Sequence, residues 1–175
     1  LSDMVTALLD LSRIEYGELK LNIEELDINA EIDHAINSLS NLGKKKNISI
    51  NCSCSKGKTV LADKGALERI LNNLIENAFK YSEKDSEINI YTKKVKDFLE
   101  ISITDEGRGI PDDEQEFIFD RFYRTAEARA TEKNGSGLGL AIVRNLVQSL
   151  NGEVGLKNSK DKGSIFWFTL PLKTS

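Results

Sequence analysis

The chain has 175 residues, of which 39% are hydrophobic and 30% charged, enough for one globular domain with its own core and one appended element. Its net charge of −4 and pI near 5.2 argue against a nucleic-acid-binding protein, since such proteins usually carry a basic patch that neutralises phosphates. No run approaches about 18 consecutive apolar residues and no charged leader precedes an apolar segment, so neither a membrane span nor a signal peptide is predicted.

The first predicted element is a helix over residues 1 to about 16, because Met4 and several leucines recur at the a and d positions of a heptad. Its apolar stripe needs a partner surface, as a helix taken from a bundle would. Gly17 is a plausible helix stop, and residues 19–24 alternate as a strand does, so a domain boundary is predicted near Gly17. The chain starts inside this pattern at Leu1, and we therefore expect it to be a fragment of a longer protein.

A second helix is expected over about 29–43, followed by strand-like runs at about 47–54 and 59–62. The first of these runs carries Cys52 and Cys54, which point to the same face of a strand because they are two residues apart. The chain has no other cysteine and a single histidine, so a four-ligand zinc site is not favoured. The preferred interpretation is a pair of buried or half-buried thiols.

A third helix, capped by Asp63, is predicted through Ser82. Asn73, Asn77 and Lys80 are spaced i, i+4 and i+7 on it, so they share one stripe that is separate from the apolar face. A carboxamide oxygen is a suitable hard ligand for Mg²⁺, which makes Asn77 the candidate metal ligand. Taken alone, each asparagine is more typical of a solvated surface residue, but their register with Lys80, Tyr81 and the downstream motifs reverses this and favours a site.

Two antiparallel strands, about 87–95 and 98–104, are predicted to end at Asp105. The Asp105 carboxylate can accept the exocyclic amino proton of adenine, and Gly107 and Gly109 would let the backbone approach the ring. Taken alone, this pattern is as typical of an ordinary turn after a strand. It becomes more specific because the aromatic-rich segment 117–124 follows.

Residues 125–135 are polar without an apolar period, which predicts a mobile loop. Residues 135–139 (Gly-Ser-Gly-Leu-Gly) open a helix over about 138–150 and offer backbone N–H groups and a positive dipole end to an anion such as triphosphate. Strands at 153–158 and 164–170 close the chain. The simplest architecture is an α+β sandwich with the helices on one face of a mostly antiparallel sheet.

In this order, segments 73–81, 105–109 and 135–140 resemble the nucleotide-binding boxes of the catalytic ATP-binding domain of bacterial sensor histidine kinases. These kinases share the GHKL superfamily with DNA gyrase B, Hsp90 and MutL. Segment 117–124 matches the F box of the kinase branch, and residues 1–18 resemble the end of its dimerisation hairpin. The resemblance implies the two-layer GHKL (Bergerat) fold for residues 19–175 and a stub of the dimerisation domain for residues 1–18.

The resemblance implies ATP and Mg²⁺ as cofactors, with Asn77 as the metal ligand. Arg124 would reach a phosphate, Lys133 would join it from a lid over residues 125–137, and the Ser164 hydroxyl would lie near adenine. We predict nucleotide contacts from Asn73, Asn77, Lys80, Tyr81, Asp105, Gly107, Gly109, Ile110, Arg124, Lys133, Gly135, Ser136, Gly137, Leu138, Gly139, Leu140 and Ser164.

The predicted catalytic residues are Asn73, Glu76, Lys80 and Arg124. In the ATP-hydrolysing relatives a glutamate that activates water stands at the position of Asn73, and an amide cannot act as a general base. This difference weakens a hydrolase interpretation, while Glu76 stays open as a base or an orienting group.

Histidine kinases of this type phosphorylate a histidine in a context like His-Glu-Leu-Arg-x-Pro, which the only histidine here, His34, lacks. The resemblance therefore implies a kinase fragment that phosphorylates its own dimerisation domain, works as a homodimer when complete, and serves a response regulator receiver domain. It implies a cytoplasmic location in a membrane-anchored sensor, without direct membrane or nucleic-acid contact by this fragment. An ATPase module and a non-enzymatic ATP-binding module remain the alternatives.

Overall fold

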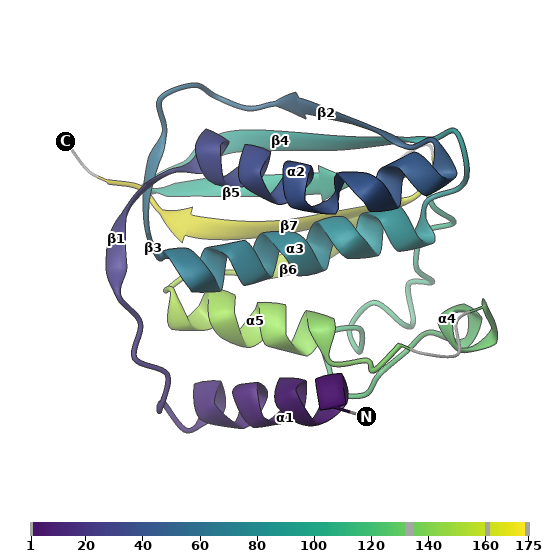
Figure 1. The fold of residues 1–175 in the computed structure, drawn as a ribbon, viewed down its shortest axis with the longest axis horizontal. Coiled ribbons are helices and arrows are strands. Elements are labelled where there is room, and N and C mark those ends of the chain that lie inside the picture. The colour runs from purple at the N-terminus through teal and green to yellow at the C-terminus, as the bar shows by residue number, and fades with distance from the viewer. Residues whose placement is uncertain (1, 132–134, 160–161, 174–175) are drawn as a thin grey trace.

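The computed structural model describes residues 2–131, 135–159 and 162–173. The helices are α1 (Ser2–Glu15), α2 (Ile28–Lys46), α3 (Lys64–Tyr81), α4 (Ala126–Thr131) and α5 (Gly139–Ser149). The strands are β1 (Ile23–Asp27), β2 (Ser49–Ser53), β3 (Thr59–Asp63), β4 (Glu87–Val95), β5 (Phe98–Thr104), β6 (Val154–Asn158) and β7 (Ser164–Pro171). Figure 1 shows two layers, with α2, α3 and α5 lying across one face of a sheet.

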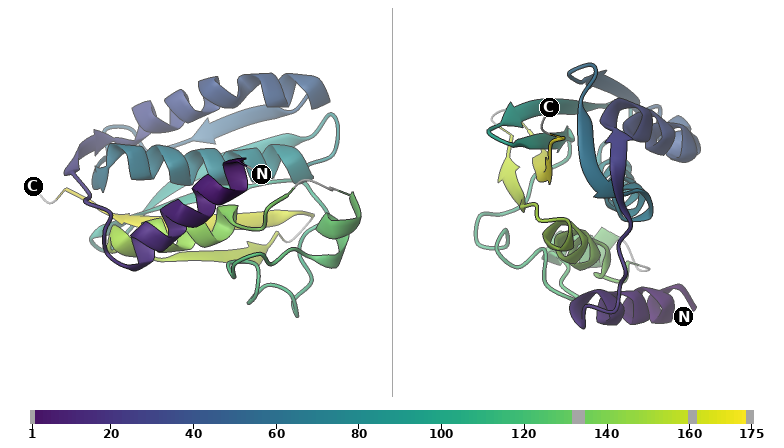
Figure 2. Two further views of the ribbon diagram at one scale, coloured as in Figure 1. Left: turned by 60° about the horizontal axis from the view of Figure 1, so that its bottom comes forward. Right: turned by 90° about the vertical axis from the view of Figure 1, so that its left-hand side faces the viewer.

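Five of the strands form a mixed sheet in the order β2-β4-β5-β7-β6. β2 runs parallel to β4, and the other three neighbouring pairs are antiparallel. β1 and β3 form a separate antiparallel pair, and a bridge between Val60 and Leu172 connects this pair to the end of β7. The side view in Figure 2 places the main helices on one side of the sheet. The predicted α+β architecture is therefore confirmed.

The core lies between the sheet and the helices, and sequence alternation explains its composition. Alternate residues of β5 and β7 are buried, because successive side chains of a strand point to opposite faces. They meet the apolar face of α3, formed by Leu67, Ile70, Leu71, Leu74 and Ile75. Burial of this face fixes the rotation of α3 about its axis and leaves the stripe of Asn73 and Asn77 free to face another part of the molecule.

The first strand lies later in the sequence than the alternation of residues 19–24 predicted. β1 spans Ile23–Asp27, because its position is set by antiparallel pairing with β3, in which Ile23 lies opposite Asp63. The Asn22 N–H donates to the Asp63 carboxylate (2.8 Å), just outside this ladder. Asp27 then ends the strand and accepts from the Asn29 N–H (2.9 Å) as the N-cap of α2. Pairing with a distant strand therefore overrode the local pattern.

The Cys52 and Cys54 sulfurs are joined in a disulfide at the end of β2, so the interpretation as two free thiols is wrong. The Cα atoms are 5.6 Å apart, Cys52 is exposed and Cys54 is half-buried. Cys54 lies just beyond Ser53, the last residue of β2 paired with β4, so the chain there is not held at the extended spacing of a strand and the two Cα atoms can come within disulfide distance. β2 is the edge strand of the five-stranded sheet, which leaves the outer residues of this run open to solvent.

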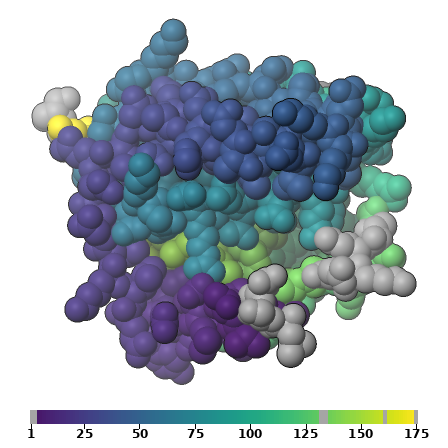
Figure 3. All heavy atoms as spheres, viewed as in Figure 1, coloured from purple at the N-terminus to yellow at the C-terminus, as the bar shows by residue number. Residues whose placement is uncertain are grey.

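Helix α1 packs against α5 through one stripe and exposes the other. Leu11 and Ile14 are buried in the common core, and Arg69 of α3 lies 3.0 Å from Asp10 of α1. Arg121 pairs with Glu15 at the end of the helix. The α1 atoms adjoin those of α3 and α5 in the space-filling view (Figure 3). Among the described residues, no helix is both long enough and apolar enough to cross a membrane.

Candidate functional site

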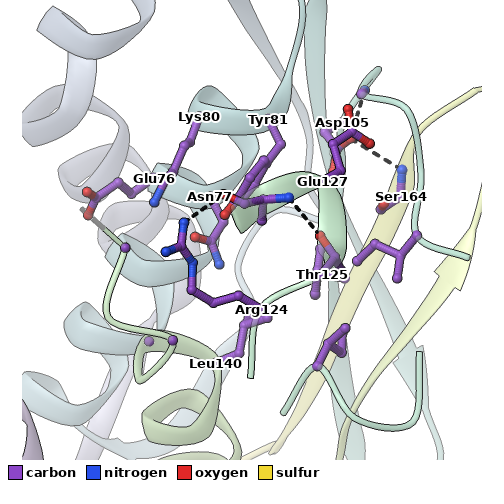
Figure 4. A pocket seen from close by; sticks show the side chains of 18 of the residues that line it. Glu76, Asn77, Lys80, Tyr81, Asp105, Arg124, Thr125, Glu127, Leu140 and Ser164 are labelled. Atoms are coloured by element: carbon purple, nitrogen blue, oxygen red, sulfur yellow. Dashed lines mark hydrogen bonds between the residues drawn. The ribbon is translucent and has the colours of Figure 1, made fainter. Parts of the chain in front are cut away.

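A cavity of about 600 Å³ opens at the carboxyl end of α3, between that helix, the segment that follows β5, the start of α5 and β7. Figure 4 shows side chains from these separate elements converging on it. All the predicted site residues that the structure describes line this cavity, with the exception of Leu138. Leu138 is fully buried and belongs to the hydrophobic core, while Lys133 lies outside the described residues.

Asp105 is the buried carboxylate of the cavity, with 4% of its surface exposed. Its Oδ1 accepts hydrogen bonds from the Gly107 N–H (2.8 Å) and the Ser164 N–H (3.3 Å), as Figure 4 shows. Burial raises the pKa of Asp105, and these two backbone hydrogen bonds act in the opposite direction. Among the described residues, no donor is bonded to Oδ2, which leaves this oxygen available to a ligand.

The pairing of β5 with β7 brings Asp105 and Ser164 together, because Thr104 lies opposite Ile165 in the register. The Asp105 N–H donates to the Ser164 carbonyl (3.0 Å), so the backbones of the two residues bond reciprocally at the end of the ladder. The contact from Ser164 to Asp105 is thus made by the backbone N–H. Whether its hydroxyl contacts adenine, as the resemblance implied, stays a prediction.

Gly107 allows the segment after Asp105 to pass against the end of α3. A Cβ on this residue would lie 2.8 Å from both the Asp105 Oδ1 and the Tyr81 carbonyl oxygen, closer than real side chains come. Gly163 is equally restricted, since its Cβ would lie inside contact distance of the Asp105 carbonyl and its φ is +93°. Because neither residue has a Cβ, the backbone on both sides can pack closely around Asp105, between α3 and β7.

Lys80 and Tyr81 form the part of the wall that belongs to the last turn of α3. The Lys80 Nζ lies 5.5 Å from the centroid of the Tyr81 ring. Burial lowers the pKa of Lys80; Glu76 opposes this shift and Arg124 adds to it. Burial raises the pKa of Tyr81, with Arg124 acting in the opposite direction. This wall is therefore rich in positive charge that has lost part of its hydration.

Asn73 connects α3 to the start of α5. Its Nδ2 donates to the Arg69 carbonyl one turn earlier (2.8 Å), and a Cβ on Gly139 would lie 2.7 Å from its Oδ1. The first turn of α5 has no side-chain cap, and the Ser136 hydroxyl accepts from the Leu138 N–H (3.2 Å) just before it. Because the first N–H groups of a helix have no acceptor within the helix itself, the start of α5 is suited to bind an anion within the cavity.

The segment 125–135 was predicted to be a loop, and this is wrong for its first part. α4 spans Ala126–Thr131, and the Thr125 hydroxyl starts it by accepting from the Ala128 N–H (3.1 Å). The Arg124 Nη2 donates to the Ala128 carbonyl (2.7 Å). The Arg108 Nη1 lies 2.7 Å from the Glu127 Oε1, and this ion pair connects α4 with the segment after β5. Short-range side-chain bonds, in place of an apolar face, account for this helix.

Several lining residues were not predicted from sequence: Glu83, Arg108, Ile118, Tyr123, Thr125, Glu127, Ala128 and Phe166. Arg108, Ile118 and Tyr123 lie within the recognised motifs, so proximity in sequence could have indicated them. Thr125, Glu127 and Ala128 lie within the segment 125–137 that was predicted as a lid, but no motif singled them out as contacts. Among the described residues, no three His, Cys, Asp or Glu side chains cluster as a metal site. The Asn77 carboxamide oxygen, with phosphate oxygens and water, would be suitable ligands for a bound divalent ion.

Comparison with known proteins gives a consistent set of relatives. A family model described as “Histidine kinase-, DNA gyrase B-, and HSP90-like ATPase” matches residues 62–174. The sensor-like histidine kinase SenX3 of Mycolicibacterium smegmatis is 34% identical over 171 residues, which are 98% of this chain and 44% of SenX3. The signal transduction histidine-protein kinase ArlS of Staphylococcus aureus is 32% identical over 163 residues, 93% of this chain and 36% of ArlS.

Solved structures agree with these relatives. The crystal structure of full-length ShkA in complex with AMPPNP has a TM-score of 0.86 and 28% identity, and the match covers 99% of this chain and 36% of that one. The histidine kinase AdeS of Acinetobacter baumannii has a TM-score of 0.82 and 25% identity, with 99% of this chain and 79% of that chain covered. The chain thus spans less than half the length of the curated relatives SenX3 and ArlS.

Proposed function

Because the chain belongs to the family of histidine kinase-, DNA gyrase B- and HSP90-like ATPases, we propose that it is the ATP-binding catalytic domain of a sensor histidine kinase. It would transfer the γ-phosphoryl group of ATP to a histidine on a separate dimerisation domain. One observation carries the proposal: a single cavity combines the buried Asp105 carboxylate with the uncapped start of α5. These groups complement the two ends of ATP, the amino-bearing base and the triphosphate.

The geometry around Asp105 suits an adenine ring. With Oδ1 already occupied by two N–H donors, Oδ2 can accept from the amino group of adenine, whereas guanine would present a carbonyl oxygen at that place. The close approach at Gly107 keeps side chains away from the edge of the base. Selectivity for adenine over guanine is therefore part of the proposal.

The opposite part of the wall suits a triphosphate with a divalent ion. Backbone N–H groups at the start of α5 would bind phosphate oxygens, and Lys80 and Arg124 would add positive charge. The Asn77 carboxamide would be the protein ligand of Mg²⁺, which usually takes its remaining ligands from water and phosphate. Bound Mg²⁺ would neutralise charge that develops on the phosphates during transfer.

The chain's own contribution to the reaction would be to position and stabilise charge. The bond from the γ-phosphorus to the bridging oxygen breaks as a bond to the acceptor imidazole nitrogen forms, and ADP leaves. Asn73 cannot activate water, and its amide is already bonded to the Arg69 carbonyl. Glu76, which lines the cavity from an exposed position, would orient Lys80 or accept a proton from the acceptor.

The acceptor would come from another domain. His34 lies on α2 with a largely exposed side chain, 3.9 Å from Glu68, and it does not line the cavity. Following the relatives, which are named sensor kinases, the complete protein would be a dimer that passes its phosphoryl group to a response regulator receiver domain. We place the domain in the cytoplasm of a membrane-anchored sensor, where ATP is available.

The proposal is tested with radiolabelled ATP, this chain, and a separate hairpin domain that carries the acceptor histidine. The label should appear on the hairpin and not on the chain, and Asn77→Ala should abolish the transfer. Asp105→Asn should weaken ATP binding by about 1–3 kcal/mol, because an amide donor replaces an acceptor in a buried contact. Asp113→Asn, an exposed carboxylate that does not line the cavity, is the matched control.

Other results would contradict the proposal in distinct ways. Equal calorimetric affinities for ATP and GTP would refute the role of Asp105. Acid-labile label on His34 would show that the acceptor is internal. Fast steady hydrolysis without a hairpin would favour an ATPase, and tight ATP binding without transfer would favour a non-enzymatic ATP-binding module.

A further inference from the structure

The last turn of α3 carries Lys80 and Tyr81 into the cavity, and its carbonyl groups have an unusual partner. A helix leaves its last four carbonyls without an intrahelical donor. Here the Ser82 N–H bonds to the Ala78 carbonyl (3.0 Å), which satisfies only the first of them. The remaining carbonyls lie at the negative end of the helix dipole, where a cation is favourable.

The Lys46 ammonium group, from the end of α2, supplies the missing donors. Its Nζ donates to the carbonyls of Phe79 (3.0 Å), Lys80 (2.6 Å) and Ser82 (3.0 Å). An ammonium group has three N–H bonds, so all its donors are engaged. The side chain is half-buried, and its stem crosses from one helix to the other. The Lys46 side chain thus caps the carboxyl end of a helix to which it does not belong, although Ser82 is the C-cap residue in the chain.

The backbone of the same residue holds the segment that leaves α3. The Lys46 carbonyl accepts from the Asp85 N–H (3.0 Å), and the side chain of the next residue, Asn47, donates to the Asp85 carboxylate (2.7 Å). The end of α3 and the turn to β4 are therefore bound to one point at the end of α2.

The fourth carbonyl of the turn, that of Tyr81, lies beside Gly107. It lies where a Cβ on Gly107 would be only 2.8 Å away, and the Gly107 N–H donates to the Asp105 Oδ1. The position of the α3 terminus thus sets how close the Gly107 turn, and with it Asp105, can come. A shift of that terminus would displace Lys80, Tyr81 and Asp105 together.

We propose that Lys46 is a positioning residue for nucleotide binding: by bonding three carbonyls at the end of α3, it holds Lys80, Tyr81 and the Asp105–Gly107 turn in register for ATP. It does not line the cavity and acts through these residues. This inference rests on the proposed function of the cavity, but the positional part concerns the unliganded protein and can be measured without nucleotide.

The test compares Lys46→Met, which keeps the apolar stem and removes all donors, with Lys45→Met. Lys45 is the exposed neighbour on α2, so the control loses the same charge from the same helix. Calorimetric affinity for Mg-AMPPNP is measured well below the melting temperature of each variant, where a residue with only a stabilising role has no effect on affinity. Lys46→Met should weaken binding about tenfold, a usual consequence of losing one or two charged hydrogen bonds, while Lys45→Met should bind like the parent.

Amide hydrogen exchange of the unliganded proteins is the second readout. The N–H groups of Ser82, Asp85 and Gly107 should exchange faster in Lys46→Met than in the parent, and not in Lys45→Met. Parental affinity or unchanged exchange in Lys46→Met would overturn the inference. If the parent itself fails to bind Mg-AMPPNP, the proposed function fails, and the exchange data alone decide the positioning role. If Lys46→Met does not fold, Lys46→Gln, which keeps two donors, replaces it under the same criteria.

Discussion

Lys80 shows how one residue at the wall of the cavity can connect stability and binding. Burial lowers its pKa below the ordinary value of a lysine, with Glu76 opposing the shift and Arg124 adding to it. The folded state therefore binds fewer protons than the unfolded state as the pH approaches the ordinary lysine range. The cost of burying the charge is present at neutral pH and diminishes as the pH rises through the lowered pKa.

Nucleotide affinity should change in the opposite direction over the same pH range. A neutral amine attracts phosphate less than an ammonium group, so affinity for Mg-AMPPNP should fall as the pH rises, before it reaches about 10.4, where an ordinary lysine titrates. Lys80→Arg should abolish this alkaline decrease, because a guanidinium stays charged. Calorimetric titrations of both proteins at a series of pH values measure the difference. An identical decrease in parent and Lys80→Arg would assign the titration to another group.

For single residues, the sequence was most informative where a motif indicates the kind of ligand contact. Asp105, Gly107 and the glycines at the start of α5 could be placed around one cavity, since each residue type serves a distinct contact there. The Ser164 N–H could not be predicted as a donor to Asp105, because it reaches Asp105 through the register of β5 and β7. Lys46 had no signal at all, as it acts on the backbone of a helix 33 to 36 residues later in the chain.

At the scale of the elements, the packing of α2 against α3 places the Lys46 backbone near the end of α3. α2 does not stop at Gly43 as predicted but continues to Lys46, and Asn47 ends it in the left-handed conformation with φ of 54°. A Cβ on Gly43 would lie 2.6 Å from the Phe79 ring. The glycine thus serves close helix packing and not helix termination, two roles that a single sequence cannot distinguish.

Gly43→Ala should therefore destabilise the protein although alanine is the better helix former. Overpacking against Phe79 and the Ile48 carbonyl costs about 1–3 kcal/mol, which exceeds the gain of about 1 kcal/mol in helix propensity. Gly65→Ala is the matched control, since its Cβ would meet nothing closer than 3.5 Å, and it should be neutral or stabilising. Urea denaturation measures both. Equal stability of the two variants would mean that Phe79 moves aside without cost.

The bounds of elements with a long apolar pattern of their own could be predicted from sequence. The bounds of elements that depend on pairing with a distant strand or on side-chain hydrogen bonds could not. α3, β4 and β5 were expected at nearly their observed bounds because burial follows their own pattern. β1 was displaced because its place depends on pairing with β3, and α4 was missed because Thr125 and Arg124 stabilise it without an apolar face. The disulfide at the end of β2 escaped prediction for a related reason, since spacing alone does not decide between thiols and a bond.

At the scale of the whole molecule, the question is whether α1 belongs to the same folding unit as the rest. The sequence pattern predicted a boundary near Gly17, and the family resemblance implied that residues 1–18 belong to a separate dimerisation domain; this division remains a proposal. The structure packs Leu11 and Ile14 into the common core, and two ion pairs connect α1 to Arg69 and Arg121. Its outer stripe remains exposed. A helix with these two faces could serve both domains at once, completing one core and offering its other side to a partner.

Leu11→Ala tests whether α1 folds cooperatively with the sheet. Leu11 is fully buried, so the truncation should cost about 2–5 kcal/mol if α1 and the sheet unfold together. Trp167, the only tryptophan of the chain, lies on β7, and its fluorescence reports on the sheet and not on α1. The urea transition followed by this signal should move to lower concentration in Leu11→Ala and stay within about 0.5 kcal/mol in Leu9→Ala, whose side chain is 56% exposed. If the fluorescence transition of Leu11→Ala coincides with that of the parent, α1 is an independent unit docked on the domain, and the boundary near Gly17 separates two cores.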